Sequence, residues 1–136
     1  MVDRARVERL LETLASYRDQ LAPLRDLPAD EYRGERALAG RYLVQASAQA
    51  CIDIANHVIA SSGWRAPVDY RDSFTVLEEQ GVIDSTLAER LRDLAGLRSR
   101  LVHIYEEIDD AIVHASLTEG LRDLSAYARA VASLPV

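Results

Sequence analysis

Residues 37–61 read ALAGRYLVQASAQACIDIANHVIAS, and this stretch decides the fold class of the chain. It lies in a segment without a helix breaker that we expect to begin near Pro28 to Glu31 and to run to about Ser61. A Ser-Ser-Gly sequence at 61–63, followed by Pro67, gives the stop signal. The segment predicts one long helix with an apolar stripe about six turns long, on which Tyr42 belongs to the core. The stripe consists of residues at steps of four: Leu38, Tyr42, Ala46, Ala50, Ile54 and Val58.

Four further helices are expected from apolar periodicity and capping patterns. Pro23 and Pro28 bracket the connection between the first helix and the long one. The fourth helix opens at a capping-box pattern from Thr86 to Glu89, and the fifth opens at a second such pattern at 116–119. No strand-like alternation or internal repeat is present. We therefore predict an all-α fold, an up-and-down bundle of about five helices, two of them long, in a single domain of residues 1–136. The four further helices are expected at about 3–21, 72–80, 84–113 and 116–131.

Composition limits the classes of function and partner. The net charge is −6 and all 16 basic residues are Arg, so the chain as a whole is a poor nonspecific binder of nucleic acid and would need a local basic patch. No run of about 18 apolar residues predicts a membrane span, and the N-terminus lacks the apolar stretch of a signal peptide. A cytoplasmic protein is expected. The single Cys51 is interpreted as a small buried apolar residue.

Two polar residues interrupt the apolar seam of the predicted fourth helix. Arg98 and Tyr105 occupy seam positions, and their spacing of seven residues places them on one face within about 20°. A guanidinium buried there without a partner would cost several kcal/mol, so Arg98 either meets a partner or faces a cleft. The other seam residues are Leu94, Leu101, Ile108 and Ile112.

The chemistry of the seam depends on Arg98 and His103. His103 lies five residues after Arg98, about 140° around the helix, so the two side chains do not stack within one helix. They would converge if two copies of this helix crossed at a two-fold axis. An imidazole suits proton transfer near neutral pH, and a guanidinium binds phosphate bidentately. Together they meet the requirements for cleavage of an RNA phosphodiester by its own 2′-hydroxyl.

Residues 97–109, LRSRLVHIYEEID, resemble the signature of the HepT branch of the HEPN ribonucleases: Arg, four residues, His, one residue, Tyr. Residues 50–63 and 70–83 resemble the second and middle helices of that family, so the resemblance covers nearly the whole chain. It implies an all-α homodimer that cleaves RNA without metal or other cofactor, at a composite site built from both chains. By this resemblance Arg98 would hold the scissile phosphate and His103 would act in proton transfer.

The resemblance also implies a toxin paired with a minimal nucleotidyltransferase (MNT-type) antitoxin, which attaches AMP to the motif tyrosine, here Tyr105. The added bulk and negative charge would block RNA beside the phosphate site. The family usually has Asn after the motif Arg, whereas this chain has Ser99. Ser99 lies four residues before His103, so it is a supporting residue that would orient the imidazole or touch phosphate. A serine hydroxyl offers a single hydrogen-bond donor, so lowered activity is an alternative to full activity.

Two other functions stay open at this point. A catalytically silent HEPN binding module would present substrate to the nucleotidyltransferase, and Ser99 and the acidic balance favour it. A purely structural helical dimer would not need Arg98 on its seam. Asp53 is a possible cleft residue that would pair with an Arg. No metal site is predicted at His57, because no Cys–His cluster accompanies it.

Three further side-chain roles are expected from position. Trp64 is interpreted as a lid over one end of the bundle. His114 and four acidic residues fall near the predicted C-terminal end of the fourth helix. His114 would interact favourably with the helix dipole there, whereas the acids would oppose it, which suggests antitoxin binding or a solvated end. The acidic residues are Glu106, Glu107, Asp109 and Asp110.

Overall fold

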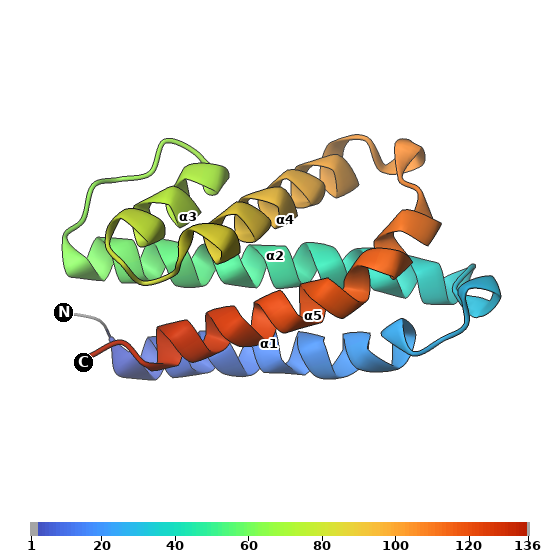
Figure 1. Cartoon of the computed structure of the whole chain (residues 1–136), viewed down its shortest axis with the longest axis horizontal. Helices are drawn as coiled ribbons and strands as arrows, with labels where there is room; N and C mark the ends of the chain where they lie inside the picture. The colour runs from blue at the N-terminus through green and yellow to red at the C-terminus, as the bar shows by residue number, and fades with distance from the viewer. Residues whose placement is uncertain (1–2, 136) are drawn as a thin grey trace.

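The computed structural model describes residues 3–135 as five α-helices joined by loops and two short 3-10 turns, with no strand among them (Figure 1). Five helices and an all-α fold are as the sequence predicts. The ends of the predicted domain, Met1, Val2 and Val136, lie outside the described residues. Within the described part no helix combines the length and apolar character that a membrane span requires. The elements are α1 (Arg4–Arg25), η1 (Ala29–Glu31), α2 (Glu35–Ser62), α3 (Tyr70–Glu79), α4 (Ser85–His103), η2 (Tyr105–Glu107) and α5 (Asp110–Ala132).

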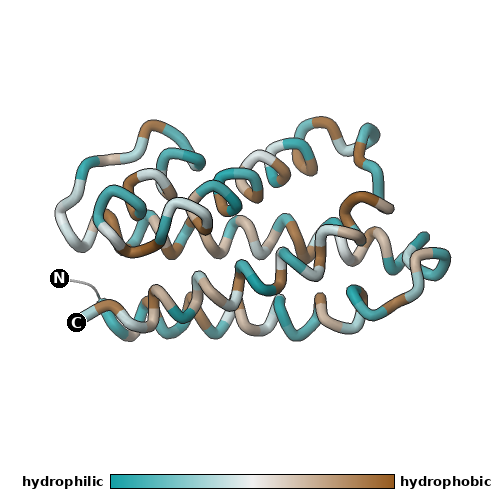
Figure 2. The backbone as a smooth tube through the Cα atoms, viewed as in Figure 1, coloured by the Kyte–Doolittle hydropathy of each residue, from teal (hydrophilic) through white to brown (hydrophobic). Residues whose placement is uncertain are grey.

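Helix α2 is the centre of the bundle. It contacts each of the other four helices, with α1 and α5 on one side and α3 and α4 on the other (Figure 1). Hydrophobic and hydrophilic residues alternate along the helices, as expected when each helix buries one side (Figure 2). All five helices contribute to one apolar core. Its largest fully buried side chains include Leu14 and Leu21 from α1, Ile52 and Ile54 from α2, Phe74 and Leu77 from α3, Leu91 from α4, and Tyr127 from α5.

The apolar stripe of α2 is buried only in part. Ile54 and Val58 are fully buried, but Leu38 is 52% exposed and Tyr42 is 62% exposed, so the expectation that Tyr42 is a core residue is wrong. The reason is the helical repeat: a step of four residues turns about 400°, so the row drifts by about 40° at each step. Over the five steps from Leu38 to Val58 it passes to the opposite side of the helix. The first half of α2 buries another set instead: Ala37, Gly40, Leu43, Val44 and Ser47.

The connection between α1 and α2 differs from the predicted one. Pro23 lies inside the last turn of α1, where its missing N–H costs the helix only one hydrogen bond. The start of α2 near Pro28 is also wrong, because residues 29–31 form a separate 3-10 turn. Gly34 then adopts φ 59°, a left-handed conformation that favours glycine, and α2 begins after it.

The predicted fourth helix is wrong in extent, because α4 ends at His103 rather than near Val113. Ile104 leaves the helical conformation with φ −130° and ψ 44°. Asp109 caps a new helix, and its carboxylate accepts a hydrogen bond from the backbone N–H of Ala111 at 2.9 Å. The acidic residues 109–110 therefore stand at the N-terminus of α5, where the helix dipole favours them, instead of opposing a C-terminus.

Four aspartates, rather than the two predicted capping boxes, begin α1, α3, α4 and α5. In each case a carboxylate accepts a hydrogen bond from a backbone N–H of the first turn, which satisfies one of the free donors there. Thr86 follows the true cap of α4, and residues 116–119 lie inside α5. The capping residues are Asp3, Asp69, Asp84 and Asp109.

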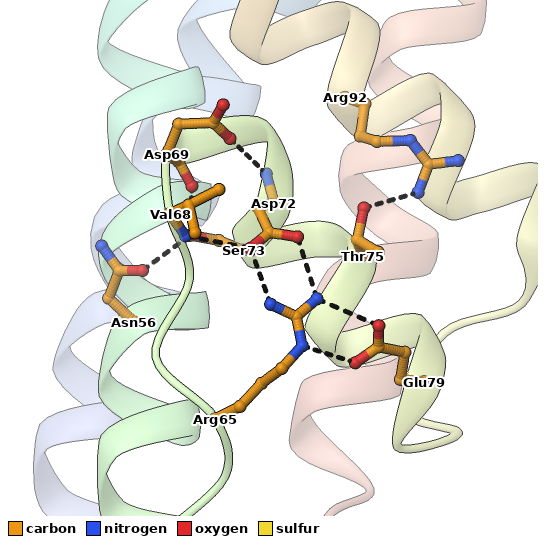
Figure 3. A network of polar contacts seen from close by, with 9 residues as sticks. All are labelled: Asn56, Arg65, Val68, Asp69, Asp72, Ser73, Thr75, Glu79 and Arg92. Carbon is orange, nitrogen blue, oxygen red and sulfur yellow. Dashed lines mark hydrogen bonds and ion pairs between the residues drawn. The ribbon is translucent and has the colours of Figure 1, made fainter.

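The loop from α2 to α3 is tied to α3 by one arginine (Figure 3). Arg65 donates to both carboxylate oxygens of Asp72, at 2.8 and 2.9 Å, and to both of Glu79, at 2.9 and 3.0 Å. The backbone N–H of Val68 also donates to Asp72, at 2.9 Å. The hydrogen bonds from Arg65 lower the pKa of Asp72 to about 2, and the bond from the Val68 N–H makes the second contribution. Trp64 in the same loop packs against the core, as expected of a lid.

The structure confirms the predicted place of Cys51 but not that of His114. Cys51 is fully buried, as predicted, and burial raises the pKa of its thiol. His114 lies in the first half of α5, so its expected place near a helix C-terminus is wrong. One of its ring nitrogens lies 3.0 Å from the carbonyl oxygen of Leu24, and the ring stacks on Tyr32 with centroids 4.4 Å apart.

Two buried tyrosines give a matched test of the core. The Tyr127 hydroxyl donates to the carbonyl of Cys51 at 2.9 Å and so links α5 to α2, whereas the buried Tyr32 hydroxyl has no partner among residues 3–135. We expect Tyr127→Phe to lower the free energy of unfolding by about 1–2 kcal/mol, because the buried carbonyl loses its donor. Tyr32→Phe should leave this free energy unchanged or raise it. Urea denaturation followed by circular dichroism measures both, and equal losses would contradict the assignment.

Candidate functional site

Arg98 lies on α4 with its side chain half-buried and without a compensating charge. Its guanidinium carbon lies 5.1 Å from the centroid of the Tyr70 ring, in a cation–π contact. Its Nε is buried and has no hydrogen-bond partner, and no carboxylate of residues 3–135 pairs with the guanidinium. An unsatisfied buried donor on a charged group is costly. The arrangement therefore suits an anion that arrives from outside the chain.

A cavity of about 290 Å³ adjoins Arg98. Asp53, the predicted cleft residue, lines this cavity together with Arg98. Its carboxylate accepts a hydrogen bond from Gln49 Nε2 at 2.8 Å and makes no ion pair with Arg98. Several side chains that line this cavity can form hydrogen bonds with a polar ligand, and its two tyrosines can also stack on one. The other lining residues, from α1 and α2, are Leu10, Thr13, Tyr17, Tyr42, Gln45, Ala46, Gln49 and Ala50.

His103 is the last residue of α4, and its side chain is exposed. Because α4 is continuous from Arg98 to His103, the two residues are separated by about 7.5 Å along the helix axis and about 140° around it. One chain therefore does not bring the imidazole and the guanidinium together. Ser99 is also exposed and lies one turn before His103, and its hydroxyl makes no hydrogen bond in the described part of the chain.

Tyr105 does not lie on α4, so the prediction that it shares a helical face with Arg98 is wrong. It begins the 3-10 turn η2, and the residue is 44% exposed. The guanidinium of Arg41, from α2, covers its ring at 4.3 Å from the centroid, and Arg41 Nη1 donates to its backbone carbonyl at 2.9 Å. The position of Tyr105 is thus set by α2 rather than by the helix that carries Arg98.

Arg41 is a residue of this site that the sequence did not predict. Besides contacting Tyr105, it forms an ion pair with Asp110 at 2.7 Å, and this hydrogen bond raises the pKa of Arg41. The one signal in the sequence is a charged residue within a mostly apolar stretch of the long helix. Its partners lie 64–69 positions away, so periodicity along α2 gives no hint of them.

The basic residues of α4 divide into paired and unpaired groups. Arg90 pairs with Glu119 at 3.1 Å, and Arg92 pairs with Glu78 at 3.1 Å. Arg98 and Arg100 form no ion pair with residues 3–135. The positive charge left for a ligand is therefore concentrated in the last turns of α4, close to His103.

Side chains that could bind a metal ion are not clustered in the described part of the chain. Residues 3–135 contain no group of three or more His, Cys, Asp or Glu side chains placed to hold one. His57 instead lies with its Nε2 3.4 Å from the hydroxyl oxygen of Ser61, one turn further along α2.

Two curated relatives share part or most of this sequence. The mRNA nuclease HepT of Shewanella oneidensis is 40% identical over 72 residues, which are 52% of this chain and 54% of that protein. The chain thus matches about half of the length of that relative. The tRNA nuclease HepT of Aphanizomenon flos-aquae is 29% identical over 129 residues, which are 93% of this chain and 88% of that protein.

A similar fold occurs in the tri-AMPylated Shewanella oneidensis HEPN toxin in complex with MNT antitoxin. The TM-score is 0.71 at 25% identity, and the alignment covers 96% of this chain and 93% of that chain. A family model described as ribonuclease HepT-like matches residues 7–131. The chain therefore belongs to the HepT-like ribonuclease family.

Proposed function

We propose that this chain is an endoribonuclease toxin that acts as a homodimer, needs no metal ion and is silenced by adenylylation of Tyr105. The single observation that carries the proposal is the Arg98 guanidinium, half-buried beside a cavity with no anionic partner among residues 3–135. Membership of a ribonuclease family and two relatives named as RNA nucleases support the activity. The whole chain, residues 1–136, would act as one HEPN domain, since all five helices share one core.

The proposed reaction uses the RNA as its own nucleophile. Arg98 binds the scissile phosphate and stabilises the negative charge that grows on it. The ribose 2′-hydroxyl loses its proton and attacks the neighbouring phosphorus, and the bond to the 5′-oxygen breaks. The products are a 2′,3′-cyclic phosphate and a 5′-hydroxyl. His103 moves the protons, because an imidazole has one nitrogen that can accept a proton and one that can donate a proton. Ser99 would orient this ring from the preceding turn.

The second copy of the chain completes the site. Arg98 and His103 of one chain are too far apart around α4 to act on the same phosphate. A two-fold axis near the end of α4 would bring His103 of one protomer to Arg98 of its partner. The exposed apolar residues at this end of α4, Val102 and Ile104, would be covered in such a dimer.

Control of the enzyme is proposed to act through Tyr105. An MNT-type nucleotidyltransferase would transfer AMP to its hydroxyl, and the similar fold of a tri-AMPylated HEPN toxin in complex with its MNT antitoxin supports such a modification. The exposed ring makes the hydroxyl accessible to a partner enzyme. Each AMP adds a negative charge and a bulky group two residues from His103, which repels an incoming RNA phosphate.

A silent binding module is the second candidate function. The observation that favours it is Ser99, whose hydroxyl makes no hydrogen bond to His103 in this structure. An imidazole without an orienting partner is a weaker general base. Such a module would bind RNA through Arg98 without cleaving it, so binding and cleavage must be measured separately.

We expect His103→Ala to reduce RNA cleavage about 100-fold or more, with little change in RNA affinity, because the change removes proton transfer. Arg98→Gln should weaken both cleavage and affinity, because the phosphate loses its cation. Cleavage of a labelled RNA in EDTA measures activity, and a filter-binding assay measures affinity. His57→Ala is the matched control and should stay active. Equal cleavage by wild type and His103→Ala, or none by either, would overturn the ribonuclease proposal.

A mixing experiment tests the composite site. Arg98→Gln and His103→Ala are each expected to be inactive alone, but a heterodimer of the two contains one site with both wild-type residues if the site spans two chains. Equal mixing after unfolding and refolding should restore about a quarter of wild-type cleavage, since half of the dimers carry one intact site of two. No recovery, with dimers shown by sedimentation, would place Arg98 and His103 of the same chain in one site.

Incubation with a cognate MNT-type nucleotidyltransferase and ATP is expected to add the mass of AMP and to abolish RNA cleavage. Tyr105→Phe should remove both effects, because no acceptor oxygen remains. Tyr42→Phe is the matched control for the mass gain alone, since Tyr42 is another exposed tyrosine but lines the cavity beside Arg98. Intact-mass spectrometry gives the readout. A mass gain that survives Tyr105→Phe would assign the acceptor elsewhere.

A further inference from the structure

The linker between α4 and α5 carries Tyr105, and it has little internal support. Its 3-10 turn has three residues, none of them buried and none capped by a side chain. Two backbone hydrogen bonds close it, Glu107 N–H to Ile104 carbonyl at 2.9 Å and Ile108 N–H to Tyr105 carbonyl at 3.3 Å. Turns of this length are weak by themselves. Whatever fixes the tyrosine must therefore come from elsewhere in the fold.

We infer that Arg41 of α2 is a positioning residue that holds Tyr105 in the orientation in which its hydroxyl accepts AMP. Arg41 Nη1 donates to the Tyr105 carbonyl at 2.9 Å, and Nη2 donates to the Ile108 carbonyl at 3.3 Å. These bonds hold both ends of the turn. The guanidinium also lies over the Tyr105 ring, 4.3 Å from its centroid, so backbone and ring are fixed by the same group.

The guanidinium is itself held rigidly. Nε and Nη2 of Arg41 donate to the two carboxylate oxygens of Asp110 at 2.7 and 3.1 Å, a bidentate pair at the first residue of α5. The Arg41 side chain is only 12% exposed. Four of its five N–H groups are thereby used, by four different acceptor atoms. A lysine has the charge but not the planar fork, so it cannot meet these acceptors together.

The inference rests on the proposed adenylylation of Tyr105. In that transfer a bond forms between the tyrosine oxygen and the α-phosphorus of ATP, the bond to the β-phosphate oxygen breaks, pyrophosphate leaves and the phenol proton passes to a base or to water. The reacting oxygen must approach in line with the leaving group. Misplacement by about 1 Å costs such reactions up to about 100-fold. A clamp that covers one face of the ring and leaves the residue 44% exposed meets this requirement.

The test compares Arg41→Gln and Arg41→Lys with Arg36→Gln, an exposed arginine on the same helix with no contact to the linker. Hydrogen exchange of the peptide 104–110 needs no partner enzyme. We expect its exchange to rise about tenfold or more in both Arg41 variants, with exchange of the α2 and α5 core amides unchanged. Initial rates of adenylylation by the nucleotidyltransferase should show kcat falling about tenfold or more, with the KM for ATP unchanged. Arg36→Gln should match wild type.

Two other results would contradict the positioning role of Arg41, and a third would contradict the proposed regulation. Unchanged exchange at 104–110, or faster exchange with wild-type adenylylation kinetics, would overturn the positioning role. A wild-type protein that gains no AMP would overturn the proposed regulation instead, while the exchange result would still report on the clamp. Should Arg41→Gln fail to fold, Asp110→Asn removes the ion pair but keeps both carbonyl bonds, and it should give intermediate exchange and an intermediate kcat. Wild-type values for Asp110→Asn would then count against the clamp.

Discussion

The contact between Arg41 and Asp110 connects the N-terminal part of the central helix α2 to the start of α5, where the chain changes direction. Without a break after His103, α4 would continue in one direction and α5 would not return along α1 and α2 (Figure 1). Asp109 caps the returning helix, and Asp110 both suits its dipole and neutralises the half-buried guanidinium of Arg41. One partly buried ion pair, completed by hydrogen bonds to two carbonyls, therefore closes the bundle at this end, and such pairs depend on these additional hydrogen bonds to offset the cost of desolvation.

Arg98 is the opposite case. Its environment offers an aromatic face and a cavity with several polar side chains, but no carboxylate of residues 3–135 forms an ion pair with it, so the fold retains an unsatisfied buried donor. A chain optimised only for stability would place an apolar side chain there or supply an acid. Asp53 lines the same cavity, but its carboxylate accepts a hydrogen bond from Gln49 and forms no ion pair with Arg98. The two arginines thus differ in their hydrogen bonding. Arg41 donates to four acceptor atoms of the chain, whereas the buried Nε of Arg98 has no acceptor among residues 3–135.

Much of this could be predicted from the sequence, because helical period and stop signals are local. The five helices, the unusual place of Arg98 and the expected proton-transfer role of His103 all come from residues close together in the chain. The errors have physical causes as well. Ile108 and Ile112 happen to continue the seam of α4, which hid the break at Ile104, although Ile112 is 67% exposed. Arg41 acts on residues more than 60 positions away, and no local pattern indicates such a contact.

The break after His103 changes how the motif Arg-x4-His-x-Tyr is understood. Its first two residues lie on a continuous helix that packs on α2, so their geometry is fixed by the core. Its third residue lies on an exposed turn, outside that helix, where a second enzyme has access to the hydroxyl. A tyrosine on the helical face of Arg98 would have competed with RNA for the same cleft before any modification. Placed on the turn, it leaves the cavity beside Arg98 open, and under the proposed regulation the charge of AMP would close the site only after the partner enzyme had acted.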